Sequence, residues 1–91
     1  MKIDVRGEAW ELKYGTLPGG GLGECHREKK LIIIRPMLGE RHLNTLLHEL
    51  THACLWDLDE EAVDEIAETA EKVLRRSGYY RRKRTNGKTR T

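Results

Sequence analysis

The chain lacks several features that would assign it to common protein classes. It has no Phe, two Pro and two Cys among its 91 residues. Two cysteines are too few for the disulfide framework of a small secreted domain. The longest apolar run, Leu31–Ile34, is far too short to cross a bilayer. The first ten residues are charged and unlike a signal peptide. We therefore expect a cytoplasmic protein that makes no contact with a membrane and keeps Cys25 and Cys54 reduced.

Phosphate-binding motifs are also missing, although glycine is concentrated at residues 16–24, in the sequence TLPGGGLGE. This glycine-rich segment lacks the Lys-Ser/Thr ending of a P-loop. It also lacks the strand–helix setting of a dinucleotide-binding fingerprint. Clustered glycines with a proline do not form a regular element, so we expect a loop here.

Charge is distributed very unevenly along a chain whose formal net charge is only +2. Residues 57–71 carry many acids and no base, whereas no acid occurs from Lys72 onward. We expect one domain, residues 1–78, followed by a solvated basic tail, residues 79–91. Such a tail is also a candidate for contact with nucleic acid or another polyanion. A domain this small buries a modest core, so a bound metal would help to stabilise it.

The first half of the chain has the patterns of short strands. Residues 2–5 and 9–15 alternate β-formers with polar residues on either side of a turn. The clearest strand is residues 29–36, KKLIIIRP, whose four aliphatic residues predict burial on both faces. We expect it to form a hairpin with the segment around residues 23–25.

The second half of the chain has helical periodicity. One amphipathic pattern runs from about Glu40 to Trp56, and another from Asp57 or Asp59 to about Arg76. The apolar stripe of the second pattern contains Val63, Ile66, Ala67, Ala70, Val73 and Leu74. The prediction is an α+β fold, in which a small antiparallel or mixed three-stranded sheet is followed by two packed helices.

The most specific motif is HELTH, residues 48–52, which has the H-E-x-x-H pattern. Residues four apart lie one turn apart on a helix, so His48 and His52 can bind the same metal ion. Glu49 projects from the neighbouring side, where it can reach a metal-bound water without being a ligand. Zinc lowers the pKa of such a water to about 7, so Glu49 can act as the general base and then protonate the leaving amine. The motif predicts one zinc ion per chain and peptide-bond hydrolysis.

A catalytic zinc usually has a third protein ligand, and no histidine follows His52. The metzincin form is excluded, because Leu58 stands where its third histidine would be. Glu60 lies near the buried face of the second helix when residues are spaced at about 100°. We predict Glu60 as the third ligand, and the alternatives are Asp59, Asp64, Glu61 and Cys25.

Residues 43–74, LNTLLHELTHACLWDLDEEAVDEIAETAEKVL, resemble the core of small gluzincin-type zinc metallopeptidase-like proteins. These include the minigluzincins and the ImmA/IrrE and SprT-like relatives that are often found in phages and prokaryotic genomes. Residues 23–36, GECHREKKLIIIRP, also resemble the strand segment before their active-site helix. The likeness covers roughly residues 22–76 and implies a zincin-like minimal core.

The resemblance also implies roles for individual residues. His48 and His52 would bind zinc, Glu60 would complete the site and Glu49 would be the general base. An extended peptide substrate would bind by strand addition to residues 31–35, which places Ile32, Ile33 and Ile34 in contact with it.

Other interpretations of the same residues remain open. The zinc could merely hold the helices together, in a non-catalytic module that binds nucleic acid through the basic tail. Glu60 could be the last member of a capping box that begins at Asp57. Tyr79 or Tyr80 could supply a hydroxyl that stabilises the oxyanion.

Overall fold

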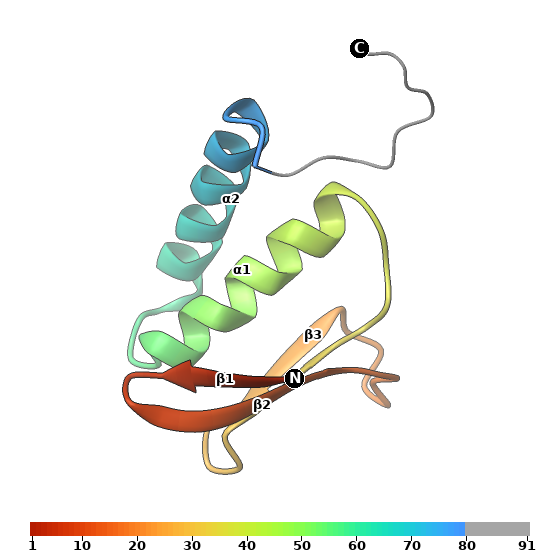
Figure 1. The fold of residues 1–91 in the computed structure, drawn as a ribbon, viewed down its shortest axis with the longest axis vertical. Helices are drawn as coiled ribbons and strands as arrows, with labels where there is room; N and C mark the ends of the chain where they lie inside the picture. The colour runs from red at the N-terminus through yellow and green to blue at the C-terminus, as the bar shows by residue number, and fades with distance from the viewer. Residues whose placement is uncertain (80–91) are drawn as a thin grey trace.

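The computed structural model describes residues 1–79, so Tyr80 and the remainder of the basic tail lie outside the described part. Neither of its helices is long and apolar enough to cross a membrane. The α+β class and the order of a sheet followed by two helices are confirmed, and the sheet has four strands (Figure 1). The elements are β1 (Lys2–Val5), β2 (Glu8–Tyr14), β3 (Gly23–His26), β4 (Leu31–Ile34), α1 (Glu40–Cys54) and α2 (Glu60–Arg76).

The sheet is mixed, and its strand order is β1-β2-β4-β3. β1 and β2 form an antiparallel hairpin, whose two turn residues Arg6 and Gly7 have φ values of 52° and 83°. Two successive positive φ values are typical of the tight turn that matches the twist of a hairpin. β4 pairs in parallel with β2 and antiparallel with β3. β4 is therefore an interior strand, and β3 is the edge strand beside it.

The hydrophobic core lies between one face of the sheet and α1. It contains Val5, Trp10, Leu12, Ile32, Ile34 and Ala53. α1 packs on β3 and β4, and α2 packs on α1 on the same side of the sheet (Figure 1). The other residues of β4, Leu31 and Ile33, are only partly buried, because neither described helix covers the opposite face. The prediction that this strand is buried on both faces is therefore wrong.

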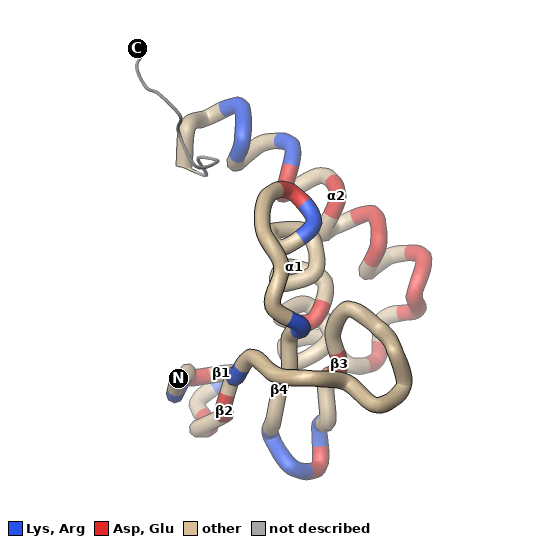
Figure 2. Tube along the Cα trace, turned by 90° about the vertical axis from the view of Figure 1, so that its right-hand side faces the viewer, with Lys and Arg blue, Asp and Glu red and all other residues tan. Residues whose placement is uncertain are grey.

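The buried face of α2 is narrower than the apolar pattern predicted. Val63 and Ala67 are fully buried, whereas Ile66 and Val73 are 41% and 55% exposed. α2 packs mainly against α1, so a single narrow stripe of side chains makes the contact. Figure 2 shows acidic residues along the first part of α2 and basic residues at its end, as the helix dipole favours.

The start of α2 is set by its cap. The Asp59 side chain accepts a hydrogen bond from the Ala62 backbone N–H at 2.8 Å, which makes Asp59 the N-cap. Glu60 is then the first helical residue, and the interpretation of Glu60 as part of a capping box with Asp57 is wrong. Since only residues 55–59 separate the helices, Glu60 is held close to the end of α1.

Candidate metal centre

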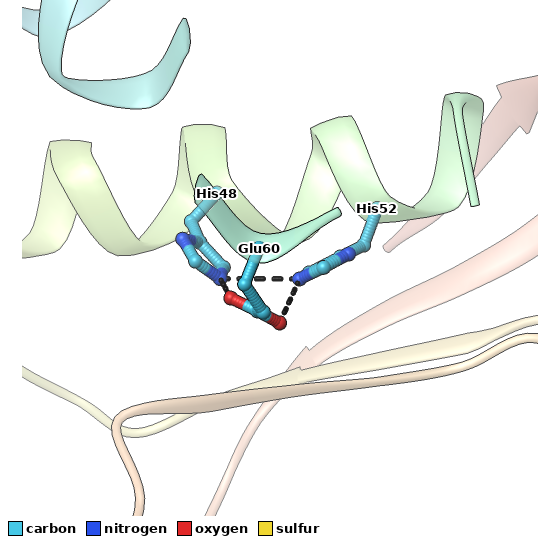
Figure 3. A group of neighbouring side chains, drawn as sticks. All are labelled: His48, His52 and Glu60. Atoms are coloured by element: carbon cyan, nitrogen blue, oxygen red, sulfur yellow. Dashed lines mark hydrogen bonds and ion pairs between the residues drawn. The ribbon is translucent and has the colours of Figure 1, made fainter. Parts of the chain in front are cut away.

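Three side chains from the two helices converge on one point (Figure 3). The Nε2 atoms of His48 and His52, one turn apart on α1, are 3.2 Å apart. One carboxylate oxygen of Glu60 lies 3.4 Å from His48 Nε2, and the other lies 3.0 Å from His52 Nε2. Within residues 1–79, these three residues form the group whose ligand atoms all lie within 4.8 Å of one another. The predicted set of His48, His52 and Glu60 is therefore brought together and could hold a metal ion.

The spacing of these atoms fits a small tetrahedral ion. Zinc binds imidazole nitrogen and carboxylate oxygen at about 2.0–2.1 Å, so two tetrahedral ligands lie about 3.3 Å apart. The 3.2 Å between the two Nε2 atoms agrees with that value, and each of these atoms has a different Glu60 oxygen at 3.4 or 3.0 Å. Two imidazoles and one carboxylate also match the donor types that a catalytic zinc prefers. The donor set would thus fit a zinc ion, and an ion held by these three residues would have a fourth position for water or a substrate.

The alternative ligands have other positions. Asp59 is engaged as the cap of α2, and Glu61 is exposed outside the group. Asp64 Oδ1 lies 3.1 Å from Nδ1 of His48, the ring nitrogen that does not face the other ligands. Glu60 and Asp64 are four residues apart on α2, so both reach the same histidine. Asp64 is therefore placed to orient His48 and to keep its Nε2 free of a proton for a metal.

If the group binds a metal ion such as zinc, replacement of Asp64 by Asn is expected to weaken that binding about 10–100-fold, the usual effect of losing a carboxylate behind a ligating histidine. The matched control is Glu65→Gln, which removes the charge of an exposed neighbour and should leave the affinity unchanged. Competition with a chromophoric chelator measures both values. Equal affinity in the Asp64→Asn protein and the wild type would show that Asp64 does not support the site.

Glu49 lies beside the metal-binding group and is deeply buried, with 7% of its surface exposed. Burial raises the pKa of the Glu49 carboxyl, while the charges of His48 and His52 lower it. A carboxylate whose pKa is raised by burial is a better proton acceptor than one in water. The position and environment of Glu49 thus suit the role of general base.

Gly23 at the start of β3 makes room for Glu49. A Cβ atom added at Gly23 would lie 2.9 Å from Glu49 Cγ, 2.9 Å from Thr45 Cγ2 and 3.1 Å from a Glu49 carboxylate oxygen. Carbon atoms in contact prefer about 3.5–4.0 Å, so any other side chain at this position would force Glu49 or Thr45 to move.

The Gly23→Ala substitution is expected to destabilise the domain by about 1–3 kcal/mol, as overpacking of a well-filled site usually does. It should also displace Glu49. The control is Gly21→Ala, where the added Cβ would meet its nearest heavy atom at 3.9 Å, an ordinary contact. Urea unfolding of both variants measures the difference. If the Gly23→Ala protein is as stable as the Gly21→Ala control, then Glu49 and Thr45 can move away from the added methyl group without lowering the free energy of unfolding.

Cys25 lies in β3 near Glu49, outside the metal-binding group. Burial, helped by the charge of Glu49, raises the pKa of the Cys25 thiol to about 11. Since a metal binds the thiolate form, a thiol that stays protonated at neutral pH is a poor ligand. The structure thus favours Glu60 over Cys25 as the third ligand.

A cleft of about 630 Å³ opens over the metal-binding group. One wall is the edge strand β3 with Arg27, and the other is formed by α1, Trp56 and Glu60. The peptide-binding role predicted for Ile32, Ile33 and Ile34 needs correction. β4 is hydrogen-bonded on both sides, to β2 and β3, so it has no free edge to which a peptide could add. The free edge beside the metal-binding group belongs to β3.

The oxyanion role considered for Tyr79 is also wrong. Tyr79 follows the C-terminal end of α2 and is 83% exposed, whereas Glu60 begins that helix. At 1.5 Å per residue, α2 separates the two by about 25 Å. Tyr80 lies outside the described residues.

Sequence patterns missed three contributors to the cleft. Arg27 and Trp56 line the cleft, and neither belongs to a recognisable sequence motif. Gly23 was assigned to the hairpin without a role at the site. The contact of Asp64 with His48 had a local signal, the spacing of four residues from Glu60.

Comparison with protein-family models, with curated proteins and with solved structures finds no match to this chain. The resemblance to gluzincin-type proteins therefore stays a prediction, and any activity has to be argued from the residues of the site.

Proposed function

We propose that this chain is a zinc-dependent metallopeptidase that hydrolyses peptide bonds. The observation that carries the proposal is the convergence of His48, His52 and Glu60 beside the buried carboxyl of Glu49. Two neutral imidazoles and a carboxylate would hold the ion and leave a position open on the side of the cleft. A metal site that served only to hold α1 and α2 together would not require a buried carboxyl next to an open cleft.

The chain's own residues would divide the chemistry among them. A bound zinc ion would supply Lewis acidity, which makes a water acidic near neutral pH and polarises a carbonyl. Glu49 would accept the proton of the attacking water and return it to the departing amine. Asp64, through Nδ1 of His48, would hold the imidazole in the orientation that a ligand needs.

The open edge of β3 offers a place for an extended substrate. Within residues 1–79, β3 has a hydrogen-bonded neighbour on one side only, and it lines the cleft from Gly23 to His26. An extended peptide could therefore add to β3 as a further strand, with main-chain hydrogen bonds that do not depend on its sequence. In this arrangement a carbonyl group of the bound peptide would lie close to Glu49.

The test is cleavage of a mixture of denatured proteins by the zinc-loaded full chain. Cleavage should stop when a strong chelator removes the metal and return when about one equivalent of zinc is added back. Zinc titration should give a stoichiometry of about one per chain. A protein that binds zinc but cleaves no peptide under any of these conditions would contradict the proposed activity.

A further inference from the structure

Trp56 stands between the metal cleft and a second cleft. It lines the metal cleft together with His52 and Glu60. It also lines a neighbouring cleft of about 690 Å³, which is bordered by Trp10 and residues 26–30 of the β3–β4 hairpin. Trp56 follows the end of α1 and is 42% exposed. A large aromatic ring in this position would be in contact with anything that extends from one cleft into the other.

Two guanidinium groups lie on the Trp56 ring. Arg27 Cζ is 3.7 Å from the ring centroid, and Arg6 Cζ is 4.9 Å from it. Arg6 Nη1 also donates to the Cys54 carbonyl oxygen at 3.3 Å. Among residues 1–79, neither arginine forms a salt bridge with an acidic side chain. The aromatic contacts hold both cations in place without neutralising their charge.

Basic side chains outnumber acidic ones among the described residues that line the second cleft. Glu8 and Glu28 line this cleft together with Arg27, Lys29 and Lys30, and Glu8 pairs with Lys30 at 3.5 Å. Figure 2 shows Lys and Arg gathered at the turn between β3 and β4, where Glu28 is the acidic residue within residues 27–30. The metal cleft thus holds the carboxylates of Glu49 and Glu60, whereas the second cleft has an excess of positive charge that includes Arg27.

The distance between the two ends matches a short extended peptide. Gly23 lies against Glu49, and Arg27 comes four residues later, immediately after β3. Four residues of extended chain span about 13 Å. For a peptide that lies along β3 with its scissile bond near Glu49, Arg27 is level with side chains about two to four residues from that bond.

We propose that Arg27, held against Trp56, binds a carboxylate of the substrate and gives the peptidase a preference for an acidic residue two to four positions from the scissile bond. This inference rests on the proposed function and specifies its substrate class. A guanidinium group forms two parallel hydrogen bonds to a carboxylate, which makes it selective for Asp and Glu over their amides. The carboxylate at a peptide's C-terminus has the same chemistry, so the experiment must separate the two sources.

The test begins with the zinc-loaded full chain and a mixture of denatured proteins, whose cleavage sites are read by mass spectrometry. Asp and Glu should be enriched at one position within four residues of the cleaved bond. A peptide pair that differs only by Glu or Gln at that position then gives the size of the preference. We expect kcat/KM to be about tenfold higher for the Glu peptide, as charge-assisted hydrogen bonds imply. A preference that disappears when the C-terminus is amidated would identify the terminal carboxylate as the bound group.

Variants of Arg27 show whether this residue binds the substrate carboxylate. Arg27→Gln should reduce the preference to less than about twofold, because cleavage of the Glu peptide falls more than cleavage of the Gln peptide. Arg27→Lys keeps the charge without the planar fork and should retain part of the preference. The matched control is Arg41→Gln, the same loss of charge at an exposed position of α1, which should retain all of it. Equal cleavage of both peptides by the wild type, or an unchanged preference in Arg27→Gln, would overturn the inference.

A binding measurement separates failure of this inference from failure of the proposed function. The zinc-loaded Glu49→Gln protein, with and without Arg27→Gln, is titrated with both peptides in a calorimeter. Cleavage by the wild type without any preference for Glu would overturn the carboxylate site and keep the peptidase. If the Glu peptide binds more tightly through Arg27 but the wild type cleaves neither peptide, the carboxylate site would be kept and the peptidase activity would be overturned. Equal binding with no cleavage would overturn both.

Discussion

Replacing Glu49 with Gln should lower the rate of peptide cleavage by about 10²–10⁴-fold, the usual contribution of a positioned general base. Gln has nearly the same shape as Glu, so the contacts with Gly23 and Thr45 should survive. It cannot accept a proton at neutral pH, which removes the step assigned to this residue. Because Glu49 is outside the metal-binding group, zinc should remain bound at about one per chain. The measurements are kcat/KM on a peptide substrate and zinc content on the same preparation.

Glu61→Gln is the control for this experiment, because it removes one negative charge from an exposed position near the site. It should cleave at the wild-type rate. Cleavage by the Glu49→Gln protein at the wild-type rate would exclude Glu49 as the base. The zinc would then be structural, and the alternative predicted from the sequence, a zinc-stabilised module that engages nucleic acid through residues 79–91, would become the leading hypothesis.

Replacing Glu60 with Ala should weaken zinc binding by more than about 100-fold, beyond the loss expected for a residue that only supports a ligand. The carboxylate of Glu60 is the only ligand of the group that α2 supplies, and both histidines contact it, at 3.4 and 3.0 Å. His48→Ala should have an equally large effect. The affinity is measured by competition with a chelator of known zinc affinity.

Thermal unfolding gives an independent measurement of the same site. A ligand that binds only the folded state at 100 times its dissociation constant stabilises it by about 2.7 kcal/mol. The Tm of the wild type should therefore rise by several degrees when zinc is added, and the Tm of Glu60→Ala should stay nearly constant. The control is Glu61→Ala, which should respond as the wild type does. Retention of zinc by Glu60→Ala would place the third ligand elsewhere, and a wild type that binds no zinc would exclude the metal centre.

Local spacing determined the parts of the site that the sequence predicts well. The four-residue separation of His48 and His52 places both on one face of any helix, whatever that helix packs against. The same holds for the position of Glu49 beside them. The α+β class was also predictable, because the change from strand to helical periodicity near Glu40 is a property of the chain itself.

Contacts between distant segments decided the rest, because they depend on how the elements pack and not on their periodicity. Asp59 rather than Asp57 caps α2, which frees Glu60 to face the histidines. Strand pairing put β4 inside the sheet and left β3 as the open edge. The cluster of Arg6, Arg27 and Trp56 joins three segments that no sequence pattern connects. The sequence by itself thus determined the histidine pair and the position of Glu49 beside it. The tertiary structure decided which carboxylate joins the histidines, which strand edge is free and where Arg27 meets Trp56, because these depend on packing between distant segments.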